Sequence, residues 1–363
     1  MNARLKCLAT GLVVAVVVMT AAPMARAAPT TIKVATVMPR GMPWTTEISR
    51  FASDVKRLTK NQVIVKVYYG GVAGTEVRSV QRMQVGQIHG VAVASVGLSL
   101  IDKSIRVLEL PFLFRTTKEF RFVARSMQTE FSARYYKRGY RLLALASLGW
   151  VYFFSKTPLA DLTHLKRRSF WTWKQDPAAA AMARVVRMTT LRLSLSGVLW
   201  ALQSKTLDTV YGMPQAVLAL QWNTAVRYYL NQRINQSIAG LVVREDVFSK
   251  LAPVHQKILI QRGRVLQRRI TQASRRLNQR ALKIMVASGI RRVQPTASYK
   301  RKHPAFRQRI WRGLVNVMYR AVDLKRVKAL LTVCRSTSCR IATSGRQPPH
   351  LKNRRRLSCL RQP

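Results

Sequence analysis

Strand-like and helix-like segments alternate along the first half of the chain, and this alternation constrains the fold more than any other feature of the sequence. Residues 32–37 and 63–69 are rich in β-branched and aromatic side chains, which favours strands. Between them, apolar residues recur every three or four positions, which predicts a helix with one buried face. Short apolar segments at 91–95 and 142–147 predict two further strands. Alternating strands and helices are typical of the α/β class, which we therefore predict.

The second half of the chain predicts one unusually long helix. A single apolar stripe continues for about 30 residues, or about 45 Å at the helical rise. The stripe consists of Val254, Ile258, Val265, Ala273, Leu277, Ala281 and Ile284. Upstream, Asp176 followed by Pro177 is typical of a helix start. The chain has 363 residues, enough for two core-forming units, and a helix of this length can contact both.

Residues 1–27 have the composition of a secretory signal peptide. Basic residues precede an uncharged apolar run at 8–22, and Ala25 and Ala27 are the small residues of a typical cleavage site. A membrane anchor is the alternative, but the run is shorter than the roughly 20 residues that span a bilayer. We therefore expect the mature chain to be exported to the periplasm.

The formal net charge is +51, from 64 Lys and Arg against 13 Asp and Glu. Such a balance suggests a polyanionic partner, whereas a signal peptide argues against a cytoplasmic nucleic-acid binder. The basic residues are spread along the chain, and no acid lies between Val247 and Val322. Two explanations of the basic excess remain open. One is an acidic external medium, in which carboxylates are protonated, and the other is relaxed selection on a degraded copy.

The segment 332–363 differs from the rest, because it is basic, contains Ser, Pro and Cys, and has no apolar periodicity. We predict a disordered tail. A Cys334–Cys339 disulfide is one option in an oxidising compartment, and Cys359 then has no evident partner. The five histidines are scattered, so we expect no metal site.

The usual catalytic signatures are missing from the sequence. There is no Gly-x-Ser-x-Gly, no His-Glu-x-x-His and no P-loop, and few acids are available as general acid/base pairs. The glycine-rich residues 70–74 lack the spacing of a phosphate-binding loop and fit a strand-to-helix turn. We therefore do not expect an enzyme.

Several short segments, taken in order, carry a resemblance to a known family. They are Y-G-G-V-A-G-T-E at 69–76 followed by Q-V-G-Q-I-H-G at 84–90, L-E-L-P-F-L-F at 108–114, L-Q-S-K-T-L-D at 202–208, and the start of the long helix at 248–259. In order and spacing they resemble motifs of the solute-binding proteins of tripartite ATP-independent periplasmic (TRAP) transporters. The resemblance extends from about residue 32 to 331.

The resemblance implies a two-lobed periplasmic binding protein fold that closes about a hinge on a small-molecule ligand. It implies a first lobe of 28–148 with a returning piece at 237–277, and a second lobe of 149–236 with 278–331. The long helix would then span the lobes. It also implies delivery of the ligand to the membrane subunits of a TRAP permease, without a cofactor and without catalysis. We expect a monomer.

This sequence departs from the family where ligand acids are bound. Trp171 stands at the position of an arginine that clamps a carboxylate, and Val151 stands near that of a second arginine. His89 replaces an aspartate, and Tyr211 and Gly212 replace a glutamate-asparagine pair. The resemblance therefore predicts a cleft that has lost part of its acid-binding chemistry.

Large aromatic and apolar residues gather around the expected cleft. The predicted ligand-binding set is Trp150, Tyr152, Arg168, Trp171, Trp173, Tyr211, Met213 and Trp222. The alternative is that these aromatics belong to the core, as we expect for Trp200 and Phe153. Arg167 and Arg168 are either solvated turn residues or a cation for a ligand acid. The set favours an apolar or amphipathic acid ligand over a simple dicarboxylate.

Two functions remain in view at this point. The first is capture of a small molecule between two lobes for a TRAP-type permease. The second is a basic secreted protein that uses the same fold to bind a polyanion or an anionic surface.

Overall fold

Two β-sheets form the framework of the protein, whose computed structural model describes residues 28–172 and 176–339. The first sheet has the order β2-β1-β3-β10-β4. Its strands are β1 (Thr30–Ala35), β2 (Val63–Tyr68), β3 (Gly90–Ala94), β4 (Tyr140–Trp150) and β10 (Gln236–Arg244). β1 pairs in parallel with β2 and β3, whereas β10 runs antiparallel to β3 and β4. The return of β10 from a distant part of the chain places it inside the first sheet.

The second sheet has the order β11-β9-β5-β8-β6-β7. Its strands are β5 (Tyr152–Ser155), β6 (Ser169–Thr172), β7 (Thr189–Arg192), β8 (Thr209–Gly212), β9 (Tyr228–Leu230) and β11 (Arg291–Val293). β5 is antiparallel to β8 and β9, and the remaining pairs are parallel. The two sheets with their helices are the two lobes of a mixed α/β protein, as the sequence predicts.

Helices connect and cover the strands. They are α1 (Pro43–Leu58), α2 (Glu76–Gln84), α3 (Ser95–Ser99), α4 (Thr117–Ser126), α5 (Gln128–Tyr136), α6 (Pro177–Val186), α7 (Leu195–Gln203), α8 (Pro214–Ala219), α9 (Glu245–Phe248), α10 (Pro253–Ala287), α11 (Ala297–Arg312) and α12 (Ala321–Ser336). Short 3₁₀ helices lie at η1 (Lys103–Glu109), η2 (Leu162–Leu165) and η3 (Trp222–Thr224). The predicted start at Asp176 is confirmed, because its side chain accepts hydrogen bonds from the first amides of α6.

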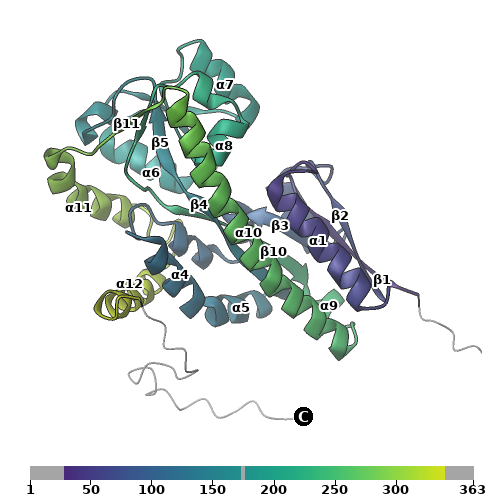
Figure 1. The fold of residues 1–363 in the computed structure, drawn as a ribbon. Helices are drawn as coiled ribbons and strands as arrows, with labels where there is room; N and C mark the ends of the chain where they lie inside the picture. Colours follow the sequence, from purple (N-terminus) through teal and green to yellow (C-terminus); the bar gives the residue numbers. More distant parts are fainter. Residues whose placement is uncertain (1–27, 173–175, 340–363) are drawn as a thin grey trace, which may run out of the picture.

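The long helix α10 lies along both lobes (Figure 1). It packs against α1 and β4 in the first lobe and against α8 in the second. The contact with β4 is close: a Cβ at Gly263 would lie 2.3 Å from the carbonyl oxygen of Leu143. Asn278 then ties the end of β4 to the second lobe, since its amide donates to the Leu148 carbonyl at 2.8 Å and accepts from the Gln215 amide at 3.2 Å.

The chain passes between the lobes at Gly149, next to the last residue of β4. Its φ of +122° is a conformation that favours glycine, and a Cβ there would lie 2.3 Å from the Asn278 side-chain nitrogen. β10 runs beside this point in the opposite direction, with a register shift between Ser237 and Ile238. The chain therefore passes between the lobes along β4, β10 and α10, and it passes again between α11, which packs against α6, and α12, which packs against α4 and η1.

Each sheet has apolar side chains on both faces. One face of the first sheet packs against α1 and α10, and the other packs against η1, α4 and α5. In the second sheet, neighbouring residues point to opposite faces: Phe153 and Phe170 lie with α6, whereas Phe154 and Trp171 lie with α7 and α8. The core on the α6 side is continuous with that of the first lobe.

The C-terminal part differs from two expectations. We expected residues 278–331 in the second lobe, where β11 pairs with β9 and α11 packs against α6, but α12 packs against α4 and η1 of the first lobe. We also expected a disordered tail from residue 332, but α12 continues to Ser336, and Cys334 is buried and joined to Cys339 by a disulfide. Leu330, Leu331 and Cys334 are buried in one apolar core, so the helix continues beyond the point at which the sequence pattern ends. Residues 1–27 and 340–363 lie outside the described residues.

Candidate functional site

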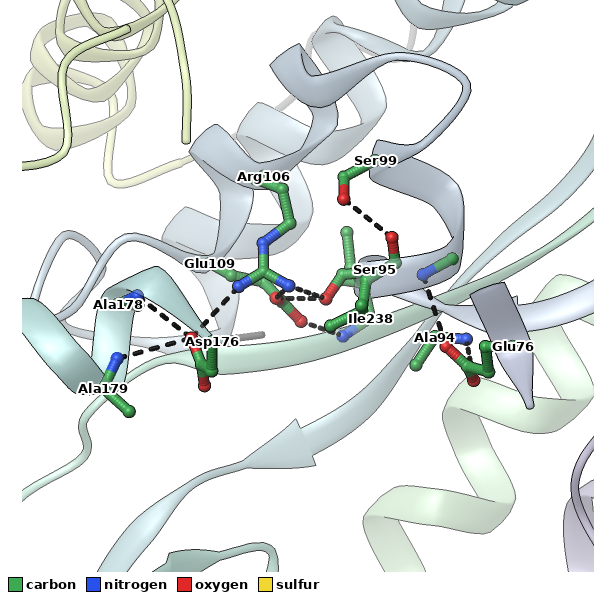
Figure 2. Close-up of polar contacts among 12 residues, drawn as sticks. Glu76, Ala94, Ser95, Ser99, Arg106, Glu109, Asp176, Ala178, Ala179 and Ile238 are labelled. Carbon is green, nitrogen blue, oxygen red and sulfur yellow. Dashed lines mark hydrogen bonds and ion pairs between the residues drawn. The ribbon is translucent and has the colours of Figure 1, made fainter. Parts of the chain in front are cut away.

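A buried cluster of polar side chains lies where the two lobes meet (Figure 2). Arg106 of η1 lies at its centre and supplies the positive charge, and this residue is only 5% exposed. Its Nη1 donates to the Ser95 hydroxyl at 2.8 Å and lies 3.5 Å from a carboxylate oxygen of Glu109. Ser95 in turn donates to Glu109, whose other oxygen accepts from the Ile238 amide at 2.9 Å. We call Ser95, Arg106, Glu109 and Asp176 the junction cluster.

Asp176 brings the second lobe into this cluster. Arg106 Nη2 lies 3.4 Å from its Oδ1, which also accepts the Ala178 and Ala179 amides of α6 at 3.0 and 3.3 Å. The other oxygen accepts the hydroxyl of Tyr211 in β8 at 2.5 Å. Donors from both lobes therefore converge on a single carboxylate.

Carboxylates outnumber the cation at this junction. Burial raises the pKa of Glu109, although the neighbouring Arg106 guanidinium opposes the shift. Glu76, at the start of α2, accepts the Ala94 and Gly97 amides at 2.8 and 3.3 Å, and burial raises its pKa as well. The burial that raises both pKa values favours the neutral form of these two acids.

A small opening leads from the surface to this cluster. Residues of both lobes line it: Ser99, Lys103, Arg106, Pro177, Val317 and Met318. Lys103 turns its ammonium group toward the Asn316 carbonyl, at 2.9 Å. The opening therefore combines two basic side chains with the first residue of α6. In the described residues, no three metal-ligating side chains gather, and no helix is long and apolar enough to cross a membrane.

Comparison with known proteins identifies the family. A model described as bacterial extracellular solute-binding protein, family 7, matches residues 34–316. The chain belongs to this family. A solute-binding protein of Verminephrobacter eiseniae is 25% identical over 224 residues, which cover 60% of this chain and 65% of that protein's length.

Solved TRAP periplasmic solute-binding proteins share the fold. One from Ochrobactrum anthropi has a TM-score of 0.77 at 21% identity, covers 85% of this chain and 97% of its own, and has its C-terminus in its ligand pocket. One from Xanthobacter autotrophicus with bound β-D-galacturonate has a TM-score of 0.73 at 16% identity, over 83% and 99%. A Bordetella pertussis receptor that binds pyroglutamic acid has a TM-score of 0.74 at 16% identity, over 84% and 99%. The predicted resemblance is confirmed.

In this family 7 protein, the predicted aromatic residues form a group of their own in the second lobe. Trp171 and Trp222 are each 2% exposed, and their rings meet edge to face with centroids 5.0 Å apart. The Trp171 ring also lies 5.3 Å from that of Tyr211, and its indole nitrogen donates to the Leu193 carbonyl at 3.1 Å. The buried indole nitrogen of Trp222 has no hydrogen-bond partner among the described residues. We call Trp171, Tyr211 and Trp222 the aromatic cluster.

The other predicted residues are dispersed. Trp150 is buried at the end of β4, where its indole nitrogen donates to Thr117 at 3.0 Å and Arg233 lies over its ring. Tyr152 meets the Tyr229 ring edge to face, and Met213 is partly buried before α8. Trp173 lies outside the described residues.

Arg168 is held in an ion pair at the surface of the second lobe, and Trp200 lies exposed on α7. Arg168 Nη1 lies 3.1 Å from Asp208 and its Nε donates to the His164 carbonyl, so the guanidinium is held beside the turn before β6. Trp200 was expected in the core, and this prediction is wrong, because the residue is 70% exposed on α7. The expectation for Phe153 is confirmed, since this residue is 1% exposed.

Sequence reasoning missed Ser95, Arg106 and Glu109 as site residues, and it recognised Asp176 only as a helix cap. One signal was available. A chain with only 13 acids places Glu109 inside an otherwise apolar segment, L-E-L-P-F-L-F. A carboxylate in such a segment is buried and needs a partner, which marks it as a candidate for a functional cluster.

Proposed function

We propose that this protein is a periplasmic solute-binding protein of the TRAP type, which captures a small molecule between its lobes and delivers it to a membrane permease. The observation that carries the proposal is the junction cluster, in which the buried Arg106 of one lobe contacts the partly buried Asp176 of the other. Membership of family 7 and the likeness to solved TRAP proteins support it. A cluster shared by two lobes suits a protein that opens and closes around a solute.

We further propose that the solute has an apolar or aromatic body. The sequence supports this proposal, because Trp171 and Val151 stand at or near the positions of the family's carboxylate-binding arginines. The aromatic cluster packs inside the second lobe next to the junction, so its rings would back the site, and the buried indole nitrogen of Trp222 is a donor that a ligand oxygen would satisfy. An amphipathic acid with its head group near Arg168 is the alternative. The Arg168 guanidinium already forms an ion pair with Asp208, so such an acid would compete with the Asp208 carboxylate for it.

Recovery of the solute tests the proposal. Native mass spectrometry of protein purified from the periplasm should show a bound small molecule, and adding that molecule to stripped protein should change the tryptophan fluorescence. Trp222→Phe should reduce the fluorescence change, whereas Trp200→Ala should keep it because Trp200 is 70% exposed on α7. Protein that carries no solute, and that responds to none in a panel of neutral and acidic small molecules, would contradict capture.

Binding of a polyanion is the second candidate, and the net charge of +51 favours it. The exposed surface of α10 is basic along its length, with Arg264, Arg268, Arg275, Arg276 and Arg280 among its residues. Polyanion binding falls by orders of magnitude from about 50 to about 200 mM salt, whereas burial of a neutral solute does not. A salt titration of heparin binding and of solute binding therefore separates the two functions.

A further inference from the structure

We propose that Asp176 is an internal carboxylate that occupies an anion site between the lobes, so that the protein selects neutral solutes over monocarboxylic acids there. This inference rests on the proposed function, because it names the class of solute that the same cleft accepts. It assigns Asp176 a role in specificity beyond capping α6, and it predicts that removing this carboxylate creates a site for a small acid.

The donors around Asp176 form a complete anion site. One oxygen receives the Arg106 guanidinium and two amides at the start of α6, and the other receives the Tyr211 hydroxyl. A guanidinium, a hydroxyl and helix N-terminal amides are the groups that bind carboxylates in receptor sites. They come from both lobes, as they must for a solute enclosed by closure. In this protein the bound carboxylate belongs to the chain itself.

Charge balance explains why binding of a solute carboxylate beside Asp176 is unfavourable. Arg106 faces Glu109 on one side and Asp176 on the other, and Glu76 lies within the same buried region. Asp176 already pairs with the Arg106 guanidinium at 3.4 Å, so a solute acid would add a negative charge that no further guanidinium of the junction cluster balances. Buried charges that lack a partner are strongly unfavourable, so a neutral solute is accepted in preference.

The route to the site is already present. The opening is lined by Arg106 of the cluster, by Lys103 and by Pro177, the residue that follows Asp176. Cutting back the Asp176 side chain would leave space the size of a carboxylate next to this opening. The Arg106 guanidinium and the first amides of α6 would then lose the carboxylate that they contact now, and a small acid could take its place beside the Tyr211 hydroxyl.

The Asp176→Gly variant tests the proposal, with acetate as the probe. Glycine is tolerated at a helix N-cap nearly as well as Asp, so α6 is expected to form. We expect acetate to bind the variant about tenfold or more tightly than it binds wild type, because charge-assisted hydrogen bonds are regained. Isothermal calorimetry and the acetate dependence of the melting temperature measure this difference.

Three controls isolate the cause. Asp176→Asn removes the charge but keeps the side chain in place, so it should gain no acetate binding. Asp176→Gly combined with Arg106→Gln should lose the gain, because the cation is gone. Asp161→Gly removes a second N-cap carboxylate, which accepts hydrogen bonds from Thr163 and Thr296 and lies 4.0 Å from the Lys302 ammonium group, and should also show no gain.

Two results would overturn the proposal: wild type that binds acetate or glucuronate as tightly as the glycine variant does, or a folded glycine variant without any gain. If the glycine variant does not fold, Asp176→Ser keeps a capping hydroxyl, and the smaller formate ion replaces acetate as the probe. An acetate gain in a protein that captures no solute would leave the anion site standing and refute the proposed function, so the two failures are distinguishable.

Discussion

The aromatic cluster and the junction cluster lie next to each other and differ in what completes them. Trp171 and Trp222 are buried by residues of the second lobe alone, among side chains of α7, α8 and the end of α10. Arg106 and Asp176 find each other only because two lobes meet. Tyr211 belongs to both, since its ring packs on Trp171 and its hydroxyl donates to Asp176.

This difference assigns the two clusters different roles, one in the stability of a lobe and the other in function. Apolar rings that are satisfied within one lobe contribute to that lobe's core, whatever the other lobe does. Buried charges whose partners lie across the junction make the relative position of the lobes matter, which a binding protein requires. The junction cluster is therefore the better candidate for specificity, and the aromatic cluster is the scaffold beside it.

Trp222→Ala should give the largest effect. Loss of this buried ring should lower the free energy of unfolding by about 3–5 kcal/mol, measured by denaturant titration. The exposed Trp200→Ala is the matched control and should change it by less than about 0.5 kcal/mol. If the Trp222 variant kept wild-type stability but bound solute more weakly, the aromatic cluster would be a binding surface and not part of the lobe core.

Arg106→Gln should lower the free energy of unfolding by about 3 kcal/mol, because breaking a buried ion pair leaves carboxylates without a cation. Arg168→Gln serves as the control. It removes a pair that is more open to solvent, and the loss should stay below about 1 kcal/mol. Equal losses in the two variants would show that the junction cluster has no special energetic role.

Tyr211→Phe tests the connection between the clusters. The ring stays, so the aromatic packing is kept, but Asp176 loses a hydrogen bond worth about 1.5 kcal/mol. Denaturant titration should show this intermediate loss. If stability is unchanged, the hydroxyl contact does not hold Asp176 in solution, and the two clusters are independent.

Glu109→Gln should give the smallest effect, visible as a change in pH dependence. Burial raises the pKa of Glu109 above its ordinary value of 4.5, so the folded protein keeps a proton that the unfolded chain releases. The free energy of unfolding should therefore fall as the pH rises through the range between the two pKa values. The variant has no such proton and should show a flatter decline. Parallel wild-type and variant profiles would mean that the folded and unfolded states hold this proton equally.

Local sequence pattern predicted much of the fold. The strands at β1 and β2, the helix between them and the long α10 follow from side-chain periodicity, which depends on near neighbours along the chain. The Asp176 cap followed from two adjacent residues. The packing of α12 on the first lobe did not, because an amphipathic helix shows which face is buried but not what covers it.

By itself, the sequence determined the α/β class, the long helix, the family and the absence of arginine at the positions of Val151 and Trp171. Only the tertiary structure decided that Trp171 faces the core of its own lobe and that Asp176 meets Arg106, a residue 70 positions earlier in the chain. The physical reason is the range of the interactions. Periodicity and capping act over a few residues, whereas a buried charge is stabilised by whichever partner the folded chain brings within hydrogen-bond distance.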